Sequence, residues 1–220
     1  MNSTVALTQR QSLPAEQRSR SPLPNLEPFL AVERLSASCG RRLRRVSWPI
    51  VPMASSWREE SPEEKAQADS AVRAALVEQE SAWPTVEMTT GLIAEITAAL
   101  DAPPSKSITQ TAVALMLDTR TRLPPNPALF LEVATRDLLE LGFQPAIVVA
   151  ACEHLRREAR FMPEIAEIIE ACRAIQIRYR RLRIDAEAAI PILQRAAETL
   201  AVEGPLPGTG AREVRAIPHR

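Results

Sequence analysis

Apolar residues recur at alternating steps of three and four from Ile165 to Leu200, and this spacing constrains the fold more than any other feature of the chain. Such a repeat places its members on one side of an α-helix and forms a single seam over about five heptads. The seam consists of Ile165, Ile168, Cys172, Ile175, Tyr179, Leu182, Ala186, Ala189, Leu193, Ala196 and Leu200. The sequence therefore predicts a long carboxy-terminal helix with one apolar side. Its stripe is weaker after Ala186, where alanines dominate, and a kink is expected at Pro191.

Five shorter helices are predicted before the long one, because start and stop signals bound them. Ser61-Pro62-Glu63-Glu64 is a capping box with proline in the first turn. Gly142 ends a helix in the left-handed conformation, and Phe143 should then fold back on Leu138. The expected ranges are 61–82, 86–100, 108–119, 127–141 and 145–160, and the apolar helix at 108–119 is expected at the centre. The fold class is thus all-α, a compact helical bundle of five or six helices over residues 61–203.

Both ends of the chain are predicted to be disordered. Residues 1–60 are rich in arginine, serine and proline, and residues 204–220 are expected to form a flexible tail. The run RRLRRVSW at 41–48 suits contact with phosphate and stacking on a base, or is simply an unstructured basic tail. Small polar residues after Met53 lead directly into the first helix. An alternative hypothesis is therefore that the protein starts at Met53. A chain that begins there should then melt at the full-length temperature.

The sequence contains no recognisable catalytic, cofactor-binding or metal site, and we therefore expect a non-enzymatic protein without a cofactor. The close glycines Gly208 and Gly210 lack the lysine and hydroxyl residue of a phosphate-binding loop. Of the two histidines, His154 has Glu158 one turn later, which supplies at most two ligands of a metal site.

Cysteine usage and hydropathy favour a cytoplasmic protein. Cys152 and Cys172 fall in apolar helical stretches, where buried free thiols are common, and this fits a reducing compartment. No apolar run approaches the roughly 20 residues of a membrane span, so no membrane association is expected. The chain has 27 basic and 27 acidic residues, so no overall field directs it to nucleic acid.

Arginines near the start of the long helix are the candidate contacts to a protein partner or to nucleic acid. They are Arg156, Arg157, Arg160, Arg173, Arg178, Arg180 and Arg181. Closely spaced arginines can grip phosphates, so nucleic-acid binding is one interpretation. Acidic residues lie on either side of these arginines and favour a second interpretation, in which the arginines form a solvated face or salt bridges between subunits.

The stretch RREARFMPEIAEIIEACR at 156–173 joins two helices with almost no loop. Pro163 forbids one continuous helix and suits the first turn of the next. Phe161 is expected to be a buried apolar pin that covers both helix ends, so Phe161 and Pro163 together form a structural corner. Truncating a buried Phe161 to alanine should cost about 3–5 kcal/mol.

The region from about residue 86 to 175 resembles the small, ATPase-free helicase-loader and inhibitor proteins of phages and related prophage replication proteins. The resemblance rests on an all-helical core followed by IVVAACEHL at 147–155 and FMPEIAEI at 161–168. It implies a non-enzymatic partner of a replicative helicase. It also implies a folded amino-terminal helical domain and a flexible carboxy-terminal segment that engages the helicase.

Three functions remain open on these grounds. The leading hypothesis is a protein–protein adaptor in phage-type DNA replication, in which residues 186–220 are dispensable for folding but required to capture the partner. The second is a DNA-binding regulator that uses the arginine-rich helix surfaces. The third is a self-assembling helical structural protein, a homo-oligomer held by the seam at 165–200.

Overall fold

A computed structural model describes residues 24–49 and 61–201, and these residues form helices and the turns between them, without a strand. The helices are α1 (Glu27–Leu43), α2 (Pro62–Glu80), α3 (Val86–Asp101), α4 (Lys106–Asp118), α5 (Pro127–Glu140), α6 (Pro145–Glu158) and α7 (Ile165–Ala201). The predicted all-α fold and its long carboxy-terminal helix are confirmed. The described residues hold seven helices, where five or six were predicted, because α1 was not expected.

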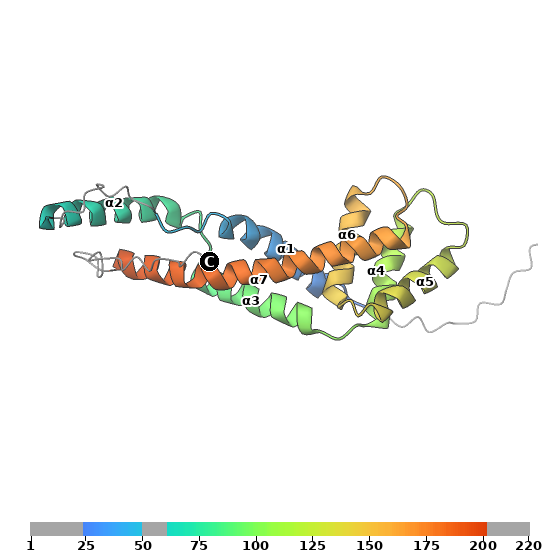
Figure 1. Ribbon diagram of the computed structural model, residues 1–220. Helices are drawn as coiled ribbons and strands as arrows, with labels where there is room; N and C mark the ends of the chain where they lie inside the picture. Colours follow the sequence, from blue (N-terminus) through green and yellow to red (C-terminus); the bar gives the residue numbers. More distant parts are fainter. Residues whose placement is uncertain (1–23, 50–60, 202–220) are drawn as a thin grey trace, which may run out of the picture.

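The longest helix, α7, organises the bundle, and the other helices are arranged along it (Figure 1). Its 37 residues span about 55 Å at 1.5 Å per residue. α3 lies along α7, and α2 continues beside the carboxy-terminal end of α7. α4, α5 and α6 gather at the amino-terminal end. The molecule is therefore elongated in the direction of α7.

The seam predicted from the sequence is the buried side of α7. Nine of its eleven members are buried, and only Ile165 and Leu200, at its two ends, are half-buried. The helices that cover the seam are α1, α2, α3 and α6 of the same chain. α7 continues through Pro191 as one helix.

Two helix-end motifs predicted from the sequence, at Ser61 and Gly142, are present in the structure. The Ser61 hydroxyl accepts a hydrogen bond from the backbone N–H of Glu64, and the Glu64 carboxylate accepts one from the backbone N–H of Ser61, at 3.2 and 2.7 Å. Gly142 has φ 72° and ends α5. The backbone N–H of Phe143 then donates to the carbonyl of Leu138 at 3.2 Å, and both side chains are buried. The capping box and the folded-back Phe143 are therefore confirmed.

α6, rather than the predicted segment 108–119, is the central helix. Eight consecutive residues of α6, from Pro145 to Cys152, are buried. α4 has five exposed positions, and one of them is a large apolar residue, Leu115, at 45% exposure. The difference arises because α4 lies between α5 and α6, whereas α6 is surrounded by α1, α3, α4 and α7.

The prediction of disorder over residues 1–60 is wrong for residues 27–43, which form α1. Val32, Cys39 and Leu43 are buried against the other helices. A Cβ added to Gly40 would lie 3.3 Å from Cδ1 of Leu182 in α7, so the two helices approach closely there. The remaining predictions for the amino terminus, including the start at Met53, and those for residues 204–220 fall outside the described residues.

The basic run at 41–48 ends α1 and packs on the rest of the chain. The Arg195 guanidinium lies over the Trp48 ring, 4.4 Å from its centroid. Nε1 of Trp83, a buried residue between α2 and α3, donates a hydrogen bond to the Arg45 carbonyl at 3.0 Å. Trp48 is thus engaged within the chain, in contrast to the base-stacking role considered for it.

Candidate partner-binding surface

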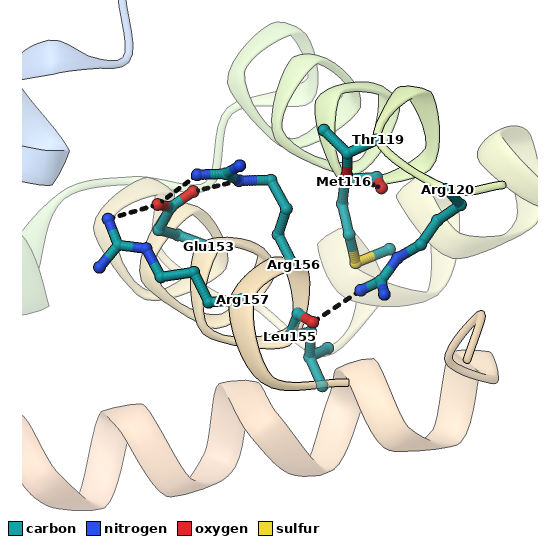
Figure 2. A network of polar contacts seen from close by, with 7 residues as sticks. All are labelled: Met116, Thr119, Arg120, Glu153, Leu155, Arg156 and Arg157. Carbon is teal, nitrogen blue, oxygen red and sulfur yellow. Dashed lines mark hydrogen bonds and ion pairs between the residues drawn. The ribbon is translucent and has the colours of Figure 1, made fainter. Parts of the chain in front are cut away.

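Two of the seven candidate arginines form an ion-paired cluster on α6. Arg156 and Arg157 both contact Oε1 of Glu153, at 2.7 and 2.6 Å (Figure 2). Hydrogen bonding from Arg156 is the main reason why the pKa of the Glu153 carboxyl lies below its ordinary value. The same contact raises the pKa of Arg156. The two arginines are therefore partly neutralised within their own helix.

Arg120, which sequence reasoning did not select, caps the end of α6 beside this cluster. Its guanidinium donates to the backbone carbonyls of Leu155, at 2.6 Å, and Ala159. Figure 2 shows the side chain reaching from the end of α4 toward the carbonyl of Leu155. The Leu155 carbonyl also accepts the backbone N–H of the C-cap residue Ala159, whose own carbonyl lies beyond the last turn of α6. A cation at this end of the helix complements the helix dipole. Arg120 thus connects α4 to α6.

Replacing Arg120 with alanine is expected to lower the free energy of unfolding by about 1–3 kcal/mol, since hydrogen bonds that involve a charged group are worth about 1.5–3 kcal/mol. Urea denaturation followed by circular dichroism measures this change. Arg122→Ala is the matched control, because Arg122 is exposed. Its effect should stay within about 0.5 kcal/mol. Equal effects of the two substitutions would show that the cap does not stabilise α6.

At the corner between α6 and α7, Met162 and Pro163 contact the core, whereas Phe161 was predicted to do so. Phe161 is 74% exposed, and the Arg160 guanidinium lies over its ring at 5.6 Å from the centroid. Met162 packs on the core and Pro163 is buried. Pro163 precedes α7 instead of lying in its first turn. Prediction of Phe161 as a buried pin is therefore wrong, because the turn directs the next two side chains inward and Phe161 outward.

Phe161→Ala is accordingly expected to change the free energy of unfolding by less than about 1 kcal/mol, as exposed positions usually do. Phe143→Ala provides the comparison, because Phe143 is 5% exposed. That substitution should cost about 3–5 kcal/mol. Urea midpoints of the two variants measure the difference, and a large shift for Phe161→Ala would contradict the exposed position.

Arg178 is held by a polar contact between α1 and α7. Its guanidinium is ion-paired with Glu33, and the Tyr179 hydroxyl donates to the same carboxylate at 2.8 Å. Tyr179 is fully buried, and burial together with the Glu33 charge raises the pKa of its hydroxyl. Tyr179 therefore remains a neutral hydrogen-bond donor, and Arg178 serves the attachment of α1 to α7.

The other three arginines, Arg173, Arg180 and Arg181, are exposed on the outer side of α7. Ile177 and Ile184 lie among them and are 65% and 59% exposed. At 100° per residue, these five side chains fall within an arc of about 100° opposite the buried seam. We call Arg173, Ile177, Arg180, Arg181 and Ile184 the outer stripe.

Charge on the outer stripe is not balanced locally. No acidic residue occurs between Glu170 and Asp185 in the sequence. Over residues 24–49 and 61–201, Arg173, Arg180 and Arg181 form no hydrogen bond or ion pair. The stripe therefore presents two exposed aliphatic side chains among three cations without partners in this part of the chain.

A groove of about 260 Å³ opens between α1, α4 and α6. Its lining is mainly apolar and comprises Leu26, Leu30, Ala112, Leu115, Met116, Thr119, Val149, Cys152, Glu153 and Arg156. Burial raises the pKa of the Cys152 thiol, so it is not a ready nucleophile at neutral pH.

Cysteines and a histidine are the remaining potentially reactive side chains among the described residues. Cys39, Cys152 and Cys172 are buried free thiols, and burial raises the pKa of Cys172 to about 12. Nδ1 of His154 lies 3.4 Å from Glu158 on the surface of α6. Within the ranges that the structure covers, no three His, Cys, Asp or Glu side chains are grouped to hold a metal ion. No helix in those ranges has the length and apolar content to cross a bilayer.

Comparison of the chain with protein-family models, curated proteins and solved structures found no match.

Proposed function

We propose that the chain is a non-enzymatic protein–protein adaptor that acts in the cytoplasm. The observation that carries this proposal is the exposure of Ile177 and Ile184 on a helix whose opposite side is already buried in the core. Burying one such side chain against a partner is worth up to about 1.5–3 kcal/mol. Single exposed apolar residues are common on protein surfaces, but two on one stripe, flanked by unneutralised arginines, favour a binding surface.

A more specific form of the proposal is that the partner is a replicative helicase of phage or prophage type. This form rests on the resemblance carried by residues 147–155 and 161–168. Its test is to mix the purified full-length chain with such a helicase, and to measure complex formation by size-exclusion chromatography and the change in DNA unwinding. If no complex forms, the helicase is excluded as the partner. The more general adaptor proposal is tested by the next experiment.

The adaptor proposal is tested by affinity purification of the full-length chain from the cells that make it. The wild-type chain should retain a specific protein, and Ile177→Ser with Ile184→Ser should lose it. Val77→Ser is the matched control, because Val77 is 63% exposed but lies on α2. Equal retention by all variants, or no retained protein, would contradict a function through the outer stripe.

DNA binding has less support than protein binding. Arg156, Arg157 and Arg178 are ion-paired to acids, so only part of the predicted arginine set is open to phosphate. Steep salt dependence of duplex DNA binding, reduced by Arg→Ala changes at Arg173, Arg180 and Arg181, would favour a DNA-binding regulator instead.

Self-assembly through the seam also has less support. The seam is buried by α1, α2, α3 and α6 of the same chain, so it is not open to a second copy. Light scattering could show a stable homodimer that substitutions in the outer stripe dissociate. This result would support self-assembly through a surface other than the seam.

A further inference from the structure

We propose that the outer stripe of α7 binds an acidic amphipathic helix of a partner protein. This inference rests on the proposed adaptor function and names the chemistry of the partner. Its basis is the pattern of exposure and charge on Arg173, Ile177, Arg180, Arg181 and Ile184, all on one side of a single long helix.

The spacing of the two isoleucines suits a helix as the bound element. Ile177 and Ile184 are seven residues apart, which is about 10.5 Å or two helical turns along α7. A second helix that packs at a shallow angle presents apolar side chains with the same seven-residue repeat. Each isoleucine can then enter the space between apolar side chains of the bound helix.

The arginines specify the charge of that helix. Arg173, Arg180 and Arg181 flank the isoleucines and have no acidic partner among the described residues. Acids beside the apolar repeat of the bound helix would pair with them, as oppositely charged residues beside a coiled-coil seam do. Glu170 and Asp185 lie at the two ends of the stripe and limit the acidic segment to about three turns.

A second copy of this chain does not fit the same surface. In an antiparallel pair centred on the two isoleucines, Arg180 would face Arg181 of the other copy. In a parallel pair, each arginine would lie near its own equivalent. Both arrangements place like charges together and leave them uncompensated, which disfavours self-association through the stripe.

Nucleic acid does not fit it either. Phosphates would pair with the arginines, but the backbone offers nothing that buries Ile177 and Ile184 at the centre of the stripe. The aliphatic pair is therefore the feature that separates a protein partner from DNA or RNA.

Site-specific photo-crosslinking of the full-length chain tests the inference. A photoreactive benzoylphenylalanine in place of Ala174 or Ala188 lies at the edge of the stripe and leaves its five side chains intact, because both alanines are exposed on α7. The same group in place of Ala128, an exposed residue of α5, is the matched control. Crosslinks are formed in the cells that make the protein, and the crosslinked peptides are identified by mass spectrometry.

The expected result is a crosslink from Ala174 or Ala188, but not Ala128, to a segment of another protein with an apolar heptad spacing and flanking Glu or Asp. Reversing two charges with Arg180→Glu and Arg181→Glu should reduce this crosslink by about tenfold or more, because like charges would then face each other. Arg41→Glu with Arg42→Glu, at exposed positions of α1, should leave it unchanged.

Other results would overturn the inference in distinguishable ways. Crosslinks to another protein from Ala128 alone would reject the stripe and keep the adaptor function. A crosslink to a second copy of the chain, or to a basic or uncharged segment, would reject the acidic helix. Crosslinks that disappear on nuclease treatment, or no protein crosslink at any position, would reject both the stripe and the adaptor.

Discussion

A chain that begins at Met53 is expected to lose cooperative folding, because it lacks α1. Val32, Cys39 and Leu43 of α1 are buried in the core, and several neighbouring apolar side chains of this segment pack on it, namely Leu26, Phe29, Leu30 and Leu35. Complete burial of an apolar side chain is worth about 1.5–3 kcal/mol, and a typical domain is stable by only about 5–15 kcal/mol. Loss of this cover is therefore comparable with the whole stability of the domain.

Thermal and urea unfolding of the shortened chain measure this effect. A chain that begins at residue 24 is the control, since it retains α1 and should melt as the full-length chain does. Melting of the Met53 chain at the full-length temperature would restore the original expectation for residues 1–52 and show that α1 contributes no stability.

A single substitution tests the same packing without deleting residues. Gly40→Leu places a side chain where even a Cβ meets Leu182 at 3.3 Å, so α1 and α7 would have to move apart. Gly91→Leu is the matched control, because no atom lies within 4 Å of a Cβ at that helical glycine. Only the change at Gly40 should destabilise the protein strongly.

Helices α2 to α7 could be predicted from the sequence because the patterns that indicate them are local. The capping box at Ser61, the glycine at Gly142 and the three-and-four spacing of α7 each act within a few residues of the structure that they determine. α1 was not predicted, because the overall composition of residues 1–60 is typical of a disordered segment. The spacing of Val32, Leu35, Cys39 and Leu43 indicates a helix, but the surrounding arginines, serines and prolines obscured it.

The polar contacts of the candidate site depend on tertiary structure and could not be predicted. Arg120 binds carbonyls that lie 35 and 39 residues away in the sequence, and Tyr179 binds Glu33, 146 residues away. No local pattern distinguishes Arg120 from the other arginines, and none indicates that the hydroxyl of Tyr179, the one tyrosine of the chain, binds Glu33. By contrast, the outer stripe can be found by spacing, since Ile177 and Ile184 fall outside the seam on the same helix.

Deleting residues 186–220 is expected to release α2 while the rest of the bundle stays folded. α2 packs against α7 and lies beside the carboxy-terminal end of that helix (Figure 1). The buried residues of α2 include Val72 and Leu76. An isolated helix of 19 residues is marginal in water. The part of α7 before Ala186 remains covered by α1, α3 and α6, and it carries most of the large seam residues.

Circular dichroism should therefore show a loss of helix larger than the deleted segment, and hydrogen exchange should become fast over residues 62–80. A chain that ends at Ala201 keeps the whole of α7 and is the control. A shortened chain without any cooperative transition would contradict this division, because it would mean that α2 and the end of α7 are required for the whole fold.

The same deletion separates two positions for the binding surface. The sequence alone suggested that residues 186–220 capture the partner. The outer stripe ends at Ile184, so a partner that binds the stripe should still be retained by the shortened chain, within about threefold of the full-length affinity (under about 1 kcal/mol). Loss of the partner from a shortened chain whose remaining helices are folded would assign binding to α2 or to residues after Asp185. Binding would instead be placed on the first half of α7 if the shortened chain retains the partner and the full-length Arg180→Glu, Arg181→Glu variant loses it. That variant changes the charge of the outer stripe and leaves the end of α7 intact.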